Sequence, residues 1–138
     1  MMFCLSIYSG QVYASDKKKE FAIESAYSTA QKAKKFNQNI PIYFNDKEAP
    51  LVERLFKDVT LEATSMTVLQ DDAEACQKAF KDVLLSMQKQ AKQLGGNAII
   101  NVHSLQDNKP TENRSMFECS LGSVVGKVVL YGEVVRLQ

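Results

Sequence analysis

Three side chains have the chemistry to bind a soft metal ion or to act as a nucleophile: Cys76, Cys119 and His103. Thiolates and neutral imidazoles are ligands that Zn²⁺ and related ions prefer. Cys119 could also act as a nucleophile with His103 as its base, provided that the thiol is free. No C-x-x-C or H-x-x-x-H pair brings two ligands together, so the spacing favours a strand histidine over a metal ligand. The state of the two thiols decides which chemistry is open to the protein.

A second candidate is the stretch CSLGSVVGKVV, residues 119–129, which has two glycines followed by a lysine. A phosphate-binding loop requires G-x-x-x-x-G-K-[ST] between a strand and a helix. Here only three residues separate Gly122 from Gly126, and Val128 rather than a hydroxyl residue follows Lys127. The β-branched residues beyond do not favour the helix whose N-terminus would hold a phosphate. The stretch therefore predicts a turn or bulge between two strands and no nucleotide site.

The remaining candidate side chains have structural explanations. The acids between Asp71 and Glu74 could pass for paired catalytic carboxylates, but their position before an apolar run is typical of helix capping. Tyr43, Phe44 and Phe56 could line an apolar groove, although core packing is the commoner role of such residues. The sequence thus indicates no catalytic set, and we predict a protein that is not an enzyme and needs no cofactor.

Length and charge narrow the class of protein. The chain has 138 residues, of which 45% are hydrophobic and 24% charged, as is typical of one globular domain. Lys+Arg 17 against Asp+Glu 16 give a net charge of +1, so no strong field attracts nucleic acid or an anionic membrane. The lysine clusters at residues 17–19 and 32–35 lack interleaved aromatic side chains, and we interpret them as solvated surface.

The N-terminal segment resembles a secretory leader. Residues 1–15, MMFCLSIYSGQVYAS, are uncharged and mostly apolar or small, and Val12 and Ala14 are suitable residues for signal-peptidase cleavage before a lysine-rich start. The apolar run is too short for a membrane span, which needs about 20 residues. No positive charge precedes it, and an ordinary N-terminal strand is the alternative interpretation. We predict a signal peptide over residues 1–14, a single domain over residues 15–138, and a periplasmic or secreted location.

Cleavage after Ala14 would have a consequence for the cysteines. It would remove Cys4 and leave Cys76 and Cys119 in an oxidising compartment. An even pair of cysteines there is expected to form a disulfide. If the thiols were instead free, they could form a metal site together with His103.

Hydrophobic periodicity predicts the elements that must position these residues. The strongest signal is a helix over residues 72–94, in which apolar side chains recur at steps of three and four residues. Asp71 and Glu74 match a capping box at its start, and Gly95 supplies the left-handed residue that ends it. Strands are expected after it over residues 97–105, 114–121 and 124–137.

The first half of the chain gives weaker signals. Alternation of apolar or small residues with Thr60, Glu62 and Thr64 predicts a strand within residues 59–69. The other expected elements are a flexible tail over residues 15–20, a short strand over 21–24, a helix over 26–36 capped by Ser25, a short strand over 40–44, and a helical turn from Pro50 to Phe56.

Two of the later strands have informative faces. In the strand over residues 97–105, we expect Ala98, Ile100 and Val102 on one face and Asn101 and a partly exposed His103 on the other. The last strand is apolar on both faces, which is unusual in an antiparallel sheet that carries a helix on one side. We therefore expect the N-terminal segment or another subunit to cover its second face.

Two stretches resemble a group of small secreted bacterial proteins that often carry the label "excinuclease ATPase subunit". They are EACQKAFKDVLLSMQKQAKQLGGNAIINVHS, residues 74–104, and FECSLGSVVGKVVLYGEVVRL, residues 117–137. The resemblance extends upstream through IPIYFND to the region of Phe21. In that group cysteines match both Cys76 and Cys119, so the resemblance implies that the two are joined in a disulfide. The chain has neither the room nor the motif for the ATPase that the label suggests.

The helix followed by LGGNAIINV and a hairpin is also similar, more distantly, to the YbjQ-type domain and to the lipoprotein RcsF. This resemblance implies an α+β fold in which a curved antiparallel sheet carries one long helix packed across it. We predict that the Cys76–Cys119 disulfide ties that helix to the sheet.

The function predicted from the sequence is a non-enzymatic periplasmic or secreted module that binds a protein partner, or itself, through the apolar last strand. The alternative is a metal-binding protein that uses His103 and free cysteines. The charge balance and the failed phosphate loop argue against a role in DNA repair, and we expect no nucleic-acid or nucleotide ligand and no membrane span.

Overall fold

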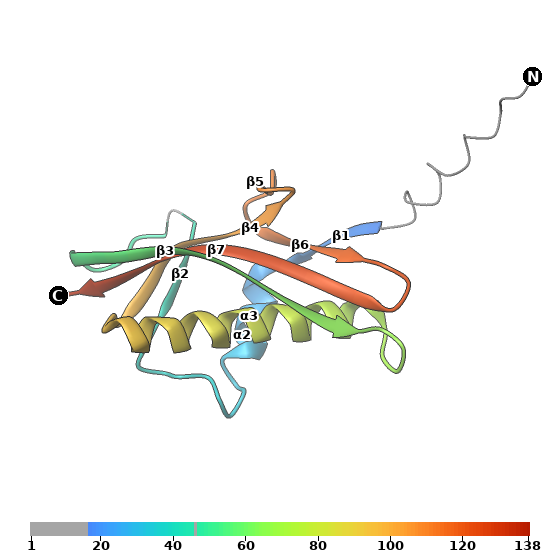
Figure 1. Cartoon of the computed structure of the whole chain (residues 1–138), viewed down its shortest axis with the longest axis horizontal. Helices are drawn as coiled ribbons and strands as arrows, with labels where there is room; N and C mark the ends of the chain where they lie inside the picture. The colour runs from blue at the N-terminus through green and yellow to red at the C-terminus, as the bar shows by residue number, and fades with distance from the viewer. Residues whose placement is uncertain (1–16, 46) are drawn as a thin grey trace, which may run out of the picture.

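The computed structural model describes residues 17–45 and 47–138, so the predicted signal peptide lies outside the described residues. The elements in chain order are β1 (Lys17–Ala22), α2 (Ile23–Ala30), β2 (Ile42–Phe44), β3 (Val52–Met66), α3 (Asp72–Leu94), β4 (Ala98–Gln106), β5 (Lys109–Pro110), β6 (Met116–Leu121) and β7 (Val125–Leu137). The strands of this part of the chain join in one seven-stranded sheet, and α3 lies along one face with α2 on the same side (Figure 1). The predicted combination of a sheet with a long helix across it is confirmed, although the sheet is larger than expected.

β7 is the central strand of this sheet. Along one side it pairs antiparallel with β3 over its whole length, from Val125 opposite Met66 to Leu137 opposite Val52. Along the other side, β6 pairs with its first residues and β4 with its last ones, while β1 and β2 extend the sheet beyond β6 and β4. Other strands of the same chain therefore occupy both edges of β7, so an added strand cannot pair with it there. The prediction that β7 binds a partner through its apolar surface stays a prediction.

One strand pair departs from the expected antiparallel sheet. β2 runs parallel to β4, with Ile42 opposite Ile99 and Phe44 opposite Val102. Parallel neighbours need a long crossover connection, and here β3 and α3 together provide it. The sheet is mixed for this reason.

α3 begins and ends where the sequence predicts. The backbone N–H of Glu74 donates to Asp71 Oδ1 over 2.8 Å, and the backbone N–H of Asp71 donates to Glu74 Oε1 over 3.3 Å. Gly95 ends the helix in the left-handed conformation with φ of 89°. Its buried residues are Ala75, Cys76, Ala79, Phe80, Val83, Leu84, Met87, Gln88 and Ala91, and this face packs against β3 and β7.

The structure corrects the predictions for the N-terminal region. Residues expected in a flexible tail form most of β1, because β1 pairs with β6 from Lys17 opposite Leu121 to Ala22 opposite Met116. α2 then begins at Ile23 with Ala22 as its N-cap, without a side-chain hydrogen bond, so Ser25 does not cap it. Pairing with a distant strand decides this region, which local signals could not reveal.

β3 is longer than predicted and starts earlier. The helical turn expected from Pro50 to Phe56 is wrong, because residues from Val52 onward pair with β7. The register shifts between Val52 and Arg54 and again between Leu55 and Lys57, and these irregularities obscure the alternation. From residue 58 to residue 66 the pairing is continuous, which confirms the predicted strand as far as Met66.

β4 contains a bulge that the sequence analysis missed. Asn101 has a φ of 53°, and the register with β7 shifts between Ile100 and His103. Ile99 and Val102 are fully buried and both lie beside Gly132 and Met87 on the α3 side, where a Cβ atom on Gly132 would meet them. The predicted single face for Ala98, Ile100 and Val102 is thus wrong, since the bulge switches faces at Asn101.

Candidate functional site

The two cysteines form a buried disulfide that links α3 to β6. Cys76 and Cys119 are joined by an S–S bond of 2.03 Å with their Cα atoms 5.9 Å apart, and both are fully buried. The predicted disulfide is confirmed, and the metal-binding alternative is wrong because it required free thiols. In residues 17–45 and 47–138 no group of three or more His, Cys, Asp and Glu side chains is placed to hold a metal ion.

The stretch that resembles a phosphate loop is a hairpin connection. Leu121 pairs with Gly126, and the N–H of Gly122 donates to the carbonyl oxygen of Val125 over 2.9 Å. β7 follows directly instead of a helix, so the predicted turn is confirmed. Lys127 projects to the face of the sheet away from α3, which we call the outer face.

His103 lies on the outer face, whereas the disulfide lies in the core between the sheet and α3. It is 9% exposed rather than partly exposed as expected, and its ring centroid is 4.9 Å from that of Tyr131. Nδ1 of His103 is 2.9 Å from the carbonyl oxygen of Asn101. The structure therefore separates His103 from both cysteines.

Around His103, polar side chains satisfy one another. Glu133 Oε2 accepts hydrogen bonds from Asn101 Nδ2 and from the Tyr131 hydroxyl, each over 3.1 Å. Burial, followed by the bond to Glu133, raises the pKa of Tyr131 to about 12. Burial also lowers the pKa of His103, despite the opposing effect of the bond to Asn101. At neutral pH the phenol keeps its proton and the imidazole is neutral, so the cluster forms a hydrogen-bonded network rather than an acid–base pair.

The three aromatic residues considered for a groove do not meet in one. Phe44 is buried in the main core, where its ring lies 6.1 Å from that of Phe80. Tyr43 packs on the smaller cluster of Ala98, Val135 and Leu137. Phe56 is half-buried with the Arg54 guanidinium 4.8 Å above its ring. The core interpretation is confirmed for Phe44, and no shared groove results.

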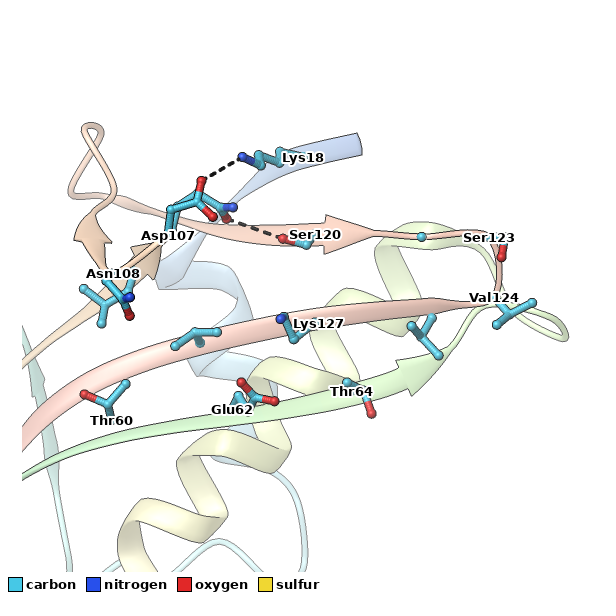
Figure 2. Close-up of a pocket in the computed structure, with 15 residues that line it drawn as sticks. Lys18, Thr60, Glu62, Thr64, Asp107, Asn108, Ser120, Ser123, Val124 and Lys127 are labelled. Carbon is cyan, nitrogen blue, oxygen red and sulfur yellow. Dashed lines mark hydrogen bonds and ion pairs between the residues drawn. The ribbon is translucent and has the colours of Figure 1, made fainter. Parts of the chain in front are cut away.

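A hollow of about 850 Å³ lies on the outer face, between β3 and the β4–β5 turn (Figure 2). Lys18 Nζ and Asp107 Oδ2 form an ion pair of 3.3 Å at its rim, and Ser120 Oγ contacts Gln106 Oε1 over 3.5 Å. The lining combines hydroxyls, amides and charges of both signs, with Thr60, Glu62 and Thr64 from β3 and Lys127 and Val129 from β7. Apolar residues also line it, namely Leu105, Val124, Val125 and Val129, so the surface of the hollow is of mixed character.

Among the described residues, β1, β2, β3 and the two-residue β5 each have an unpaired edge, and only the edge of β3 is both long and without protection. Exposed strand edges invite pairing with other chains, and proteins usually shorten them or place lysines on them. β1 carries three consecutive lysines, Lys17 to Lys19, and β2 has only three residues. β3 is fifteen residues long and, within the described residues, pairs with β7 alone.

The regular half of β3, Val59–Met66, has none of the protective features. It reads VTLEATSM, without Lys, Arg or Pro, and carries one charge, Glu62. The two register shifts of β3 lie before this half, so they do not distort it. We call Val59–Met66 the open edge.

Exposed apolar side chains flank the open edge on both sides. Before it, Leu51, Val52 and Leu55 are 71%, 42% and 56% exposed. At its end and beyond it, Met66, Val68 and Leu69 are 59%, 61% and 96% exposed. Single exposed apolar residues are ordinary, but here two groups of them lie at the two ends of a strand that has one unpaired edge.

The described part of the chain contains no helix with both the length and the hydrophobicity of a membrane span. No protein-family model matches the chain, and no curated protein matches it. The open edge of β3, which sequence reasoning missed, is the feature of the molecule that points most directly to a function.

Proposed function

We propose that the protein is a non-enzymatic, exported module that binds a protein partner by accepting an additional strand at the open edge of β3. In this mode of recognition, main-chain hydrogen bonds provide affinity and alternate side chains provide specificity. The single observation that carries the proposal is the long unpaired edge, beside protected edges at β1 and β2. This replaces the apolar last strand as the partner-binding element.

The disulfide supports the proposed export. Disulfides persist in oxidising compartments and are rare in the cytosol, where thiols are kept reduced. The Cys76–Cys119 bond spans 43 residues of sequence and is sealed in the core, as a structural bond should be. A periplasmic or secreted location accounts for such a bond. The proposed relationship to the small secreted bacterial proteins and to the lipoprotein RcsF would fit the same setting.

The side chains of the open edge define what a partner strand must carry. On the α3 side, Leu61 and Ala63 are only half-buried, so apolar residues of an added strand would complete their cover. On the outer face, Thr60, Glu62 and Thr64 are exposed and line the hollow. Polar or basic residues suit that side, since directly opposite charges of unlike sign stabilise a strand pair.

Site-specific photo-crosslinking in the source cells tests this proposal. A photoreactive amino acid at position 62, on the outer face of β3, is expected to form a covalent adduct with the bound partner, whose identity follows from mass spectrometry. The matched control is the same amino acid at Lys89, which is exposed on α3 and should form no adduct. Absence of an adduct at position 62, or equal adducts at both positions, would contradict strand addition at β3.

A further inference from the structure

We propose that the strand added at β3 is β3 of a second copy of this chain, antiparallel and related by a two-fold axis at Leu61. This inference rests on the proposed function, because it uses the same open edge. Homo-oligomers with a two-fold axis use one self-complementary patch from each subunit. Three properties of β3, namely its alternating faces, its charges and its exposed ends, select this axis from the alternatives.

The faces of β3 exclude half of the registers. Residues directly opposite each other in an antiparallel pair project to the same side of the sheet. Val59, Leu61, Ala63 and Ser65 face α3, whereas Thr60 and its alternate neighbours face outward. An axis between two residues would set side chains that face α3 opposite outward-facing ones of the second copy, for example Leu61 opposite Glu62 when the axis lies between these two. The axis must therefore pass through a residue.

Like charges exclude two of the central registers. An axis at Thr60 would place Asp58 opposite Glu62 of the second copy, twice, and an axis at Glu62 would place the two Glu62 side chains opposite each other. Like charges directly opposite destabilise a strand pair. An axis at Leu61 avoids both, because it sets Thr60 opposite Glu62 and Asp58 opposite Thr64.

The axis at Leu61 also creates the better apolar contacts. It sets Leu61 opposite Leu61 and Val59 opposite Ala63, so the half-buried residues on the α3 side cover one another. An axis at Ala63 avoids like charges as well, but it sets Leu61 opposite Ser65 and shortens the paired segment. Leu61 is thus the centre that matches side chains from residue 58 to residue 64, within the continuous part of β3.

The exposed apolar residues at the two ends of β3 favour an axis at Leu61 over one at Ala63. Leu55 precedes Leu61 by six residues and Met66 follows it by five, and both project to the outer face, opposite Val135 and Val125 of β7. Antiparallel pairing at Leu61 therefore brings the Leu55 end of one copy alongside the Met66 end of the other. An axis at Ala63 would set Leu55 beside Asp71 instead.

The first test measures dimer dissociation by sedimentation equilibrium for the wild type and for charge variants at Thr60, which is exposed. Thr60→Lys adds an opposite charge facing Glu62 at two symmetric places and should tighten the dimer by about 2- to 30-fold. Thr60→Glu should weaken it by a similar factor. Ser86→Lys and Ser86→Glu, at an exposed serine of α3, are matched controls and should leave dissociation unchanged. Melting of the dilute monomer separates effects on folding from effects on association.

The two charge variants also discriminate among registers. With the axis at Thr60, a lysine there would face a lysine and weaken the dimer, and with the axis at Ala63 it would face Met66 and lose its effect. Either result would overturn the register centred on Leu61.

Cysteine crosslinking tests the axis itself in the full chain. Leu61→Cys should give a disulfide-linked dimer under mild oxidation, whereas Ala63→Cys, which would face Val59, should not; the parent chain with its native cysteines is the baseline. Equal crosslinking at both positions would overturn the axis. A wild-type chain that stays monomeric at high concentration would overturn the proposal that the added strand comes from a second copy of the chain. A photo-adduct at position 62 with a different protein would then still support strand addition at β3. Failure of both measurements would reject the two proposals together.

Discussion

Gly126 lies directly against the disulfide: a Cβ atom on this glycine would be 3.1 Å from Sγ of Cys119 and 3.3 Å from Sγ of Cys76. A larger residue at this position of β7 would press on both sulfurs, and on Leu121 at 3.3 Å, unless these neighbours moved by a few tenths of an ångström. This contact explains the second glycine of the stretch that resembles a phosphate loop, and it connects the central strand to the link between α3 and β6.

Replacing this glycine should cost stability without affecting the turn beside it. We expect Gly126→Ala to lower the free energy of unfolding by about 1–3 kcal/mol, the usual cost of overpacking a core. Ser123→Ala, in the exposed turn, should change it by less than about 0.5 kcal/mol. Urea denaturation of both variants checks this. In a Cys76→Ala/Cys119→Ala background the cost of Gly126→Ala should shrink, and an unchanged cost would show that the sulfurs are not the cause.

Removing the disulfide should have a larger effect. The bond spans 43 residues of sequence, and the loop-entropy model assigns about 4 kcal/mol to closing such a loop. The Cys76→Ala/Cys119→Ala variant should lose about this much unfolding free energy, together with the cost of the deleted sulfurs. Reduced wild-type protein is the control that keeps both sulfurs. Equal melting temperatures for the oxidised and reduced proteins would contradict a stabilising role.

Stability should also fall in mild acid because of His103. Burial lowers its pKa below the ordinary value of 6.5, so the folded protein binds fewer protons here than the unfolded chain, and nearby Arg114 acts in the same direction while Glu133 opposes it. The stability that neutral His103 contributes to the folded protein is complete above about pH 6.5 and is lost as pH falls toward the lowered pKa. Denaturation of the wild type and of His103→Gln between pH 7.5 and pH 5 measures it. Parallel curves for the two proteins would rule out this origin of the pH dependence.

Glu118 should give the opposite pH dependence, with its contribution to the stability of the folded protein lost as pH rises. Burial, then the nearby Glu20, raises the pKa of its carboxyl, and Oε1 is shielded without a hydrogen-bond partner among the described residues. A raised pKa means that folding favours the protonated acid, so its contribution is complete below about pH 4.5 and is lost as pH rises through the raised value.

Glu118→Gln should therefore stabilise the protein at pH 7, by less than about 1 kcal/mol because the side chain is partly solvated. The gain should disappear near pH 4, which urea denaturation at the two pH values can measure. Glu62→Gln, at an exposed carboxylate, should leave the stability of the monomer unchanged at both. A Glu118→Gln protein that is less stable than the wild type at pH 7 would show that the carboxylate is favourably paired.

Elements with local signals could be predicted well. α3 has an apolar stripe, a capping box at Asp71 and Glu74, and a left-handed Gly95, so all the information for its limits lies within the helix and its neighbours. The turn after β6 was predicted for the same reason. The start of β3 was predicted wrongly. The residues from Val52 to Phe56 have a spacing that also suits a helical turn, and only their pairing with β7 makes them part of a strand.

The candidate site depended still more on tertiary contacts. The sequence identified the cysteines and His103 but not their separation, because the Asn101 bulge changes which side chains face α3. It also assigned partner binding to β7 on the basis of apolar composition. A central strand and an edge strand that binds a partner have similar compositions, so composition could not show which of the two β7 is.

By itself, therefore, the sequence determined the long helix and its ends, a pair of cysteines suited to a disulfide, and the failure of the phosphate-loop motif. Each of these depends on residue types at short spacing. Only the tertiary structure decided that β7 is enclosed, that Gly126 makes room for the disulfide, and that β3 keeps an open edge. The physical reason is that hydrogen bonds between strands and contacts across a core join residues far apart in the chain, so a strand's free edge is a property of the whole sheet.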